Sequence, residues 1–420
     1  MKEKLVMLLA AVILTAGTIF VTACVVKESP AQAESIPVTE EKQRETEEMR
    51  NVKETRAITE MNGFSFELMD RLLEQKAVEE NLVVSPYSVW LCLAALTNGT
   101  EGSAKEELFA SLGYPGLTQE AFNEIAQKFN GMPVQSANAL FVSQNAEITE
   151  AFESVYTREY EGGLFTVDFA DPKAVGKINA WASEKTEGNI EKILESIDPD
   201  TRAAIANAVY FSDGWSTVFL EENTAESTFY GIKQNQMVPF MNHRFSELPY
   251  YETENMQAVI LSTNQGGQLC LMLPKEGYSA EEVLATANQE LLDAIQTAQR
   301  NTVVLSVPRF CVKSEPFSVL EQLQEMGIVI TDREKNLLTQ LVEGEALTIS
   351  QAMHSAMLEV DEKGMTAAAV TVMGLMRMAM PREIEPIELV FEKPFAFLLT
   401  MNAEEMGSQV LFGGVVNHIE

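Results

Sequence analysis

The sequence predicts an α+β fold in which several helices and a large sheet form one domain. Helical patterns dominate the beginning of the globular region and strand patterns its end, whereas an α/β fold would alternate the two. Length alone would allow two or three domains, but no internal repeat and no second linker interrupts the globular region. We therefore expect a single domain over residues 59–420.

Four segments have the spacing of apolar residues that is typical of helices. The first begins near Asn62, where Phe64, Leu68 and Leu72 recur between charged residues. The others span residues 86–96, 103–112 and 178–187.

Runs of apolar residues with high β-propensity predict the strands. In the middle of the chain they span residues 136–142, 203–211, 258–261, 267–273 and 303–310. We expect 258–261 and 267–273 to pair. The chain closes with three more strands, over residues 389–391, 395–401 and 410–416.

The N-terminus has the pattern of a secretory signal. Lys2 and Lys4 precede an apolar run over residues 5–21, and Cys24 then follows the small residue Ala23. This ending resembles a bacterial lipobox, so residues 1–24 are interpreted as a signal peptide after which Cys24 is lipidated. The alternatives are an ordinary signal cut near Ala33 and a retained transmembrane anchor, because the apolar run is near spanning length.

Residues 25–58 are expected to form a disordered tether. They mix acidic and basic residues, include Pro30 and Pro37, and contain few large apolar side chains. Such a segment cannot bury enough surface to offset the entropy lost on ordering. With a lipid on Cys24, the tether would hold the domain at the cell surface. Without the lipid the protein would be secreted.

Composition excludes several classes of function. The formal net charge of −32 opposes binding to phosphate backbones, so we expect no nucleic-acid partner. Cys92, Cys270 and Cys311 are far apart and have no metal-ligand spacing, so they are interpreted as free thiols. We expect no disulfide, no metal and no cofactor.

Catalytic motifs are missing as well. The sequence contains no Gly-x-Ser-x-Gly elbow and no Ser-x-x-Lys nucleophile motif. None of His243, His354 and His418 has metal-binding spacing to another histidine. A hydrolase with a dispersed triad is the enzyme alternative, and we expect that the protein is not an enzyme.

Residues 364–381 do not fit an ordinary surface loop. In this acidic chain they contain no carboxylate and only one base, Arg377. Their side chains are small or apolar on both parities of a strand, as required of a strand that is covered on both faces of a sheet. The alternative from this stretch alone is a buried helix rich in Ala and Met.

This stretch resembles the reactive-centre loop of the serpins. Asp361-Glu362-Lys363-Gly364, followed by Met365-Thr366 and Ala367-Ala368-Ala369, is similar to the family's hinge. Further similar blocks follow in the family's order, at residues 81–88, 98–103, 178–190, 207–219, 393–397 and 411–415. The chain is thus identified as a member of the family. The resemblance implies the serpin fold, with a large central sheet, further sheets, eight or nine helices and an exposed reactive-centre loop.

The resemblance also implies a mechanism. A serpin is a suicide substrate: the target protease cuts the loop, and the loop's N-terminal arm then inserts as a new strand into the central sheet. The protease is left as a covalent 1:1 acyl complex. Thirteen arm residues at about 3.3 Å each reach roughly 43 Å, enough to cross a domain. The implied partners are extracellular serine proteases, which the protein would inhibit as a monomer.

The family's spacing from Glu362 puts the reactive bond at Met378-Ala379. An unbranched apolar Met378 suits elastase-, chymotrypsin- or subtilisin-like pockets. Arg377 is the alternative and would attract trypsin-like enzymes, and Arg382 is a third choice.

The resemblance assigns the remaining site residues. The hinge comprises Glu362 and Gly364 to Ala369, with Gly364 supplying conformational freedom. Met365 replaces the small hydroxyl residue usual at this position, so insertion could be slower. Trp215 matches the family's breach tryptophan, where insertion begins. The family's shutter, which lies under the opening of the sheet, corresponds to Ser85, Ser88, Asn207 and His354.

A second function class is a non-inhibitory serpin that acts as a binding protein. Its hinge would carry charge or bulk that blocks insertion. The alanines at 367–369 favour an inhibitor instead.

Overall fold

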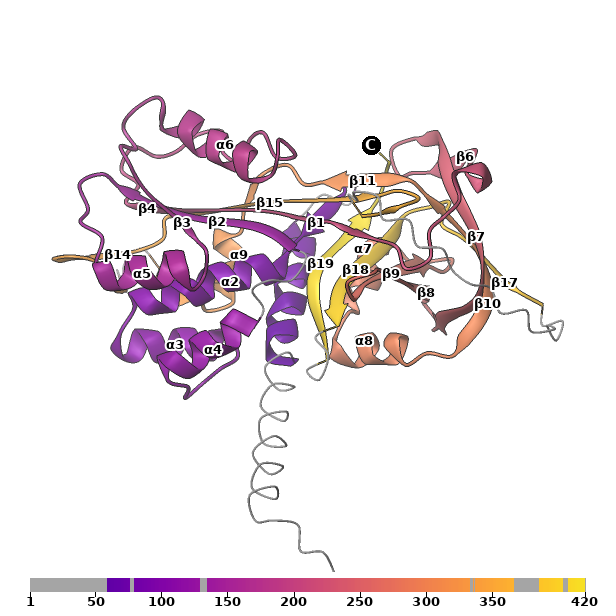
Figure 1. Ribbon diagram of the computed structural model, residues 1–420, viewed down its shortest axis with the longest axis horizontal. Helices are drawn as coiled ribbons and strands as arrows, with labels where there is room; N and C mark the ends of the chain where they lie inside the picture. Colours follow the sequence, from indigo (N-terminus) through magenta and orange to yellow (C-terminus); the bar gives the residue numbers. More distant parts are fainter. Residues whose placement is uncertain are drawn as a thin grey trace, which may run out of the picture. The chain divides into compact units, whose positions relative to one another are not determined.

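Two large β-sheets carry the fold, and helices pack around them (Figure 1). The computed structural model describes residues 59–75, 79–128, 134–332, 335, 337–365, 385–402 and 407–419. The predicted signal peptide and tether, residues 1–58 with Cys24, lie outside the described residues. Among those described, no helix combines the length and apolarity that a membrane span requires.

The first sheet, called here the central sheet, is built on four long strands. Their order is β3 (Gly163–Val167), β2 (Val134–Ser143), β4 (Ala203–Phe211) and β15 (Gln351–Val360). β4 and β15 run parallel to each other. On the outer side of β15 lie β11 (Phe310–Lys313) and β12 (Phe317–Ser318), and at one end lie the two-residue strands β16 (Gly364–Met365) and β5 (Asp213–Gly214).

The middle of the central sheet is buried on both faces. Every residue of β4 is buried, and its sequence AAIANAVYF is apolar on both parities apart from Asn207. Ala204, Ala206 and Ala208 pack beneath α6 (Ala174–Lys185). The other face packs against helices that include α2 (Pro86–Leu96), and Figure 1 shows these helices on the side of the strands opposite α6. Coverage of both faces explains why β4 has no polar parity.

The second sheet forms most of the other half of the fold. Its order is β1 (Leu82–Val84), β19 (Ser408–Val416), β18 (Phe395–Asn402), β9 (Gly267–Pro274), β8 (Met256–Ser262), β7 (Asn235–Glu252), β10 (Arg300–Pro308) and β17 (Ile387–Val390). β6 (Ala225–Tyr230) pairs with β7. At the β1–β19 contact a Cβ on Gly414 would lie 2.0 Å from the Leu82 carbonyl oxygen, so only glycine fits there. A small hairpin, β13 (Leu338–Val342) and β14 (Glu345–Leu347), completes the strands.

The helices are short apart from the first. Residues 59–75 are helical, and side-chain caps begin others, such as Ser85 at α2. The remaining α-helices of the described chain are α3 (Gly102–Ser111), α4 (Gln119–Lys128), α5 (Glu150–Arg158), α7 (Ala280–Ala285), α8 (Gln289–Gln296) and α9 (Leu320–Glu325). Short 3-10 turns lie at η1 (Thr97–Gly99), η2 (Glu221–Asn223) and η3 (Val329–Thr331). The predicted α+β class is confirmed.

Two sequence predictions need correction. The strand expected over 303–310 is two strands in different sheets: β10 ends at Pro308, and β11 begins at Phe310. Pro308 has no N–H to continue a ladder, which explains the break. The helix expected over 178–187 ends at Lys185, because Glu187 and Gly188 have φ of 52° and 86° and turn the chain away.

Candidate functional site

The predicted hinge begins in a tight turn between β15 and β16. Val360 pairs with Met365 across this turn, while Gly364 and Met365 pair on their other side with Gly214 and Asp213 of β5. The Asp361 carboxylate accepts hydrogen bonds from the N–H groups of Lys363 (2.7 Å) and Gly364 (3.0 Å). The first residues of the hinge therefore already lie between two strands of the central sheet.

The segment that contains Trp215 holds this turn from outside. The Trp215 indole N–H donates to the Asp361 carbonyl at 2.8 Å, and its backbone N–H donates to the Lys363 carbonyl at 2.8 Å. The Phe219 N–H donates to the Glu362 carbonyl at 3.0 Å. Three successive carbonyls of the turn are thus bound by one segment, and the breach role of Trp215 stays a prediction.

Glu362 is a buried carboxylate with strong partners. Its side chain is 4% exposed, and the Arg309 guanidinium donates to it at 2.6 to 2.8 Å. The Thr224 hydroxyl donates to it at 2.5 Å. Burial alone would raise the pKa of Glu362, but these hydrogen bonds outweigh burial and lower the pKa.

Sequence reasoning missed Arg309 and Thr224. Arg309 is the one charged residue in the apolar run over residues 303–310, so an unexplained base there was a usable signal. Thr224 gave none.

Met365 is fully buried and belongs to the main hydrophobic core. Met365 was expected to slow insertion, but its backbone already pairs in the sheet and its side chain is already buried in the core. The rest of the predicted loop lies outside the described residues, namely Thr366, Ala367, Ala368, Ala369, Arg377, Met378, Ala379 and Arg382. These assignments stay predictions.

The four predicted shutter residues come together at the middle of the β4–β15 pair. His354 and Asn207 are direct partners in the parallel register, and α2 presents Ser85 and Ser88 to them from below. The Ser88 hydroxyl donates to the side-chain Oδ1 of Asn207 at 2.8 Å. Asn207 in turn donates to Asn138 of β2, a member of this network that sequence reasoning missed.

The shutter geometry fixes the proton on His354. The Ser85 backbone N–H donates to His354 Nε2 at 3.1 Å, so Nε2 is an acceptor and Nδ1 carries the hydrogen. Nδ1–H then donates to the side-chain Oδ1 of Asn207. Burial lowers the pKa of His354 to about 3, so the ring is neutral at physiological pH.

β16 lies where the pairing of β4 with β15 ends. β4 and β15 pair from Gln351 and Ala204 up to Met357 and Tyr210. Beyond this point β16 lies between β15 and β5, antiparallel to both. A longer β16 would replace one parallel ladder by two antiparallel ladders, and antiparallel pairing is slightly more stable per residue.

Other chemistry is sparse in the described part of the chain. No group of three or more His, Cys, Asp or Glu side chains there could hold a metal ion. Cys92 and Cys270 are buried thiols, and burial raises the pKa of each to about 12. Cys311 is half-buried.

Comparison with known proteins agrees with this geometry. The family model described as serpin (serine protease inhibitor) matches residues 59–419. A serpin-like protein of Thermococcus kodakarensis is 27% identical over 88% of this chain and 87% of its own length. Alpha-1-antiproteinase of Rattus norvegicus is 26% identical over 84% of this chain and 87% of its own.

Solved structures share the fold. The native state of the thermophilic serpin tengpin superposes with a TM-score of 0.73 at 26% identity, covering 86% of this chain and 94% of its own. Human thyroxine-binding globulin gives a TM-score of 0.76 at 23% identity, covering 87% of this chain and 99% of its own.

Proposed function

The chain belongs to the serpin family of serine protease inhibitors, and on that premise we propose that it traps proteases as a suicide substrate. The observation that carries the proposal is the position of β16. Gly364 and Met365 already lie between β15 and β5, so the arm that follows them starts at the entrance to the central sheet.

The reaction is acyl transfer that stops halfway. The serine hydroxyl of the protease attacks the carbonyl carbon of Met378, the Met378-Ala379 peptide bond breaks, and the Ala379 amine leaves with a proton. The protease is then bound to Met378 as an ester. Residues 366–378 are now free at one end and can extend β16. This carries the ester away from its original position and distorts the active site of the protease. Loss of one oxyanion donor alone slows such chemistry by about 10²–10³, so the ester persists.

Burial drives the insertion. Six sheltered side chains of the arm at about 1.5–3 kcal/mol each give on the order of 10 kcal/mol before ordering costs. The exchange of a parallel ladder for two antiparallel ladders adds to this gain.

The target class follows from Met378. Its unbranched apolar side chain fits the specificity pockets of elastase-, chymotrypsin- and subtilisin-like proteases. If the protease instead reads Arg377, trypsin-like enzymes are the targets.

The experiment compares cut and uncut protein. Cleavage in the loop should raise the melting temperature by roughly 20 °C or more, given about 10 kcal/mol and about 2–4 °C per kcal/mol. Incubation with the target protease should also give a complex that survives denaturing gel electrophoresis. A matched control is Ala367→Arg, which places a charge in the inserting arm and should be cut without becoming more stable. Unmodified protein that melts no higher after cleavage would refute the proposal.

The second candidate is a binding protein without inhibitory activity. It is favoured by one observation: Met365, a larger residue than is usual at this hinge position, fills the space where insertion starts. Human thyroxine-binding globulin, solved in complex with its ligand, shows that the fold also occurs in a binding protein. This candidate predicts cleavage with no stable complex and no rise in melting temperature.

We also propose that the protein acts outside the cytoplasm, anchored through lipid on Cys24 and held away from the membrane by residues 25–58. Metabolic labelling with a fatty acid should mark the wild-type chain and not Cys24→Ala. A secreted, unlabelled wild-type chain cut near Ala33 would overturn the anchor but not the inhibitor.

A further inference from the structure

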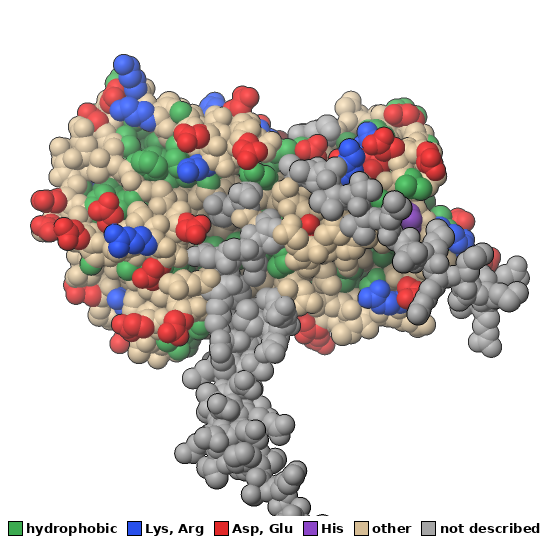
Figure 2. All heavy atoms as spheres, viewed as in Figure 1, with side chains coloured by type: hydrophobic (Ala, Val, Ile, Leu, Met, Phe, Trp, Pro, Cys, Tyr) green, Lys and Arg blue, Asp and Glu red, His purple; other side chains and the backbone are tan. Residues whose placement is uncertain are grey.

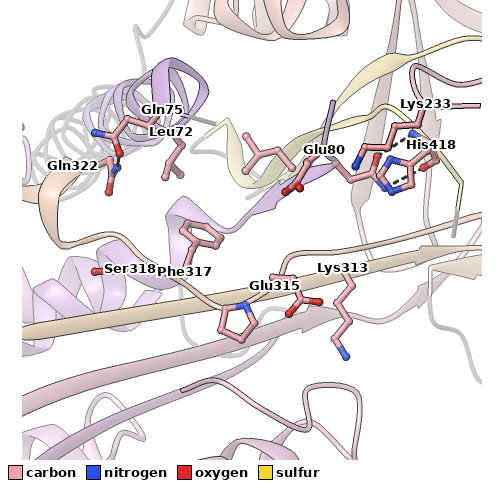
Figure 3. Close-up of a pocket in the computed structure, with 13 residues that line it drawn as sticks. Leu72, Gln75, Glu80, Lys233, Lys313, Glu315, Phe317, Ser318, Gln322 and His418 are labelled. Carbon is pink, nitrogen blue, oxygen red and sulfur yellow. Dashed lines mark hydrogen bonds between the residues drawn. The ribbon is translucent and has the colours of Figure 1, made fainter. Parts of the chain in front are cut away.

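A pocket of about 430 Å³ lies beside β12, outside the hinge and shutter (Figure 3). Segments from distant parts of the chain line it, including the first helix, the turn after β6, strand β12 and helix α9. Its volume is within the range of about 300–1,000 Å³ that is usual for small-molecule sites.

One end of the pocket is buried and carries an unsatisfied acceptor. Gln322 is 3% exposed, and its amide N–H₂ group donates to Gln75. The carbonyl oxygen of Gln322 has no hydrogen-bond partner. A buried acceptor without a partner is costly, and this oxygen is shielded from solvent, so a ligand N–H gains the hydrogen bond when the Gln322 amide rotates toward the pocket. Leu72 and Phe317 supply the apolar part of the lining.

The rim of the pocket has charges of both signs. Two ammonium groups, on Lys233 and Lys313, and two carboxylates, on Glu80 and Glu315, line it. None of these four forms an ion pair with another described residue. The rim thus has no net formal charge, although the whole chain carries −32 and acidic side chains are spread over the face in Figure 2. A ligand with both charges suits this rim better than an anion or a cation does.

The arrangement in Figure 3 orders these groups. Gln75 and Gln322 lie at one end of the pocket, Lys233 and His418 lie at the other, and Phe317 lies between them. A matching ligand has an N–H donor at one end, an apolar group in the middle and a carboxylate at the other end. The volume lies at the small end of the range usual for small-molecule sites, which suits a ligand of about dipeptide size.

From these features we propose that the pocket binds a zwitterionic peptide of about dipeptide size. Its carboxylate pairs with Lys233, its amine or amide N–H donates to Gln322, and its apolar side chain packs on Phe317. The binding site does not depend on the proposed inhibitory function.

The pocket is coupled to the shutter through one ring. Phe317 pairs with His354 across β12 and β15, and the two rings meet edge to face with centroids 5.4 Å apart. A ligand that packs on Phe317 therefore fixes one neighbour of His354. The regulatory consequence, slower opening of the central sheet when the pocket is occupied, rests on the proposed function.

Histidine NMR provides the test, because the full chain has only three histidines. Leucyl-alanine is titrated to about 10 mM, the range in which ligands of this size bind. The ring signals of His418, which lines the pocket, and of His354, which lies behind Phe317, should shift with saturation, while His243 should not move. Lys233→Gln and the C-terminally amidated dipeptide should each weaken binding about tenfold or more.

The controls separate the outcomes. Lys192→Gln, a surface lysine away from the pocket, should bind leucyl-alanine like the wild type. No saturable shift of His418, or an unchanged affinity in Lys233→Gln, would overturn the site. A shift of the His418 signal without a shift of the His354 signal would support the binding site and overturn its coupling to the shutter. Formation of the protease complex in the absence of dipeptide tests the inhibitory function separately, so the two proposals can fail independently.

Discussion

Acid should weaken the native central sheet through His354. The ring is buried, and its pKa is about 3 in the folded protein against about 6.5 in an unfolded chain. Between these values the unfolded chain binds a proton that the native form cannot accept. His354 therefore contributes its full stability above about pH 6.5, and this contribution is lost as the pH falls toward 3. Two pH units below 6.5 correspond to about 2.7 kcal/mol at pH 4.5.

The matched variant is His354→Asn, whose amide can hydrogen-bond in place of the ring but cannot titrate. The free energy of unfolding is measured for both proteins from urea transitions followed by tryptophan fluorescence at pH 7.5 and 4.5. Carboxylates such as Glu362 titrate in both proteins and cancel in the difference. The wild type should lose about 2.7 kcal/mol more than the variant between the two pH values. Equal losses would show that His354 is not held neutral by burial in the sheet.

Three further predictions concern the hinge and the loop. Met365→Glu buries a carboxylate beside Asp213 and should expel β16, which would be seen as lost amide-exchange protection at Gly364. The control Met365→Leu should lower the free energy of unfolding by less than about 1.5 kcal/mol, and equal protection in both variants would contradict this prediction. Arg309→Met leaves the Glu362 carboxylate buried without its cation and should lower the free energy of unfolding, measured by thermal unfolding, by about 3–5 kcal/mol. Adding Glu362→Gln should recover part of this loss, and a double variant no more stable than Arg309→Met would argue against the ion pair. Mass spectrometry of the protease complex should show cleavage after Met378, and oxidation of Met378 to the sulfoxide should slow inhibition of an elastase-like enzyme about tenfold; a cut after Arg377 or Arg382 would reassign the reactive bond.

Elements with strong local signals could be predicted from the sequence. The helix expected over 86–96 is α2, because Ser85 caps it and Pro86 fits its first turn. The strand expected over 203–211 is β4, where nine successive buried residues include Ile205, Val209, Tyr210 and Phe211, which have high β-propensity. The shutter residues, named from the resemblance, meet at one point of the structure.

Features that depend on distant contacts were not predictable. β15 pairs with β4, β11, β12 and β16, yet its sequence QAMHSAMLEV has no clear period, and we did not predict it. The partnership of Arg309 and Glu362 joins residues 53 positions apart and depends on the chain passing from one sheet to the other at Arg309. No local pattern encodes such a crossing.

The seating of Gly364 and Met365 has a kinetic consequence. When a strand is added to a sheet, forming the first pair is usually the slow step, because several residues must be ordered before any pairing energy is gained. Here the first pairs of β16 exist before cleavage, so insertion would begin at the propagation step. Its rate would depend on opening the seven register pairs between β4 and β15. His354 and Asn207 form the fourth of these pairs from the hinge end, so a growing strand would meet the polar network halfway, after the pairs formed by Met357, Ala356 and Ser355.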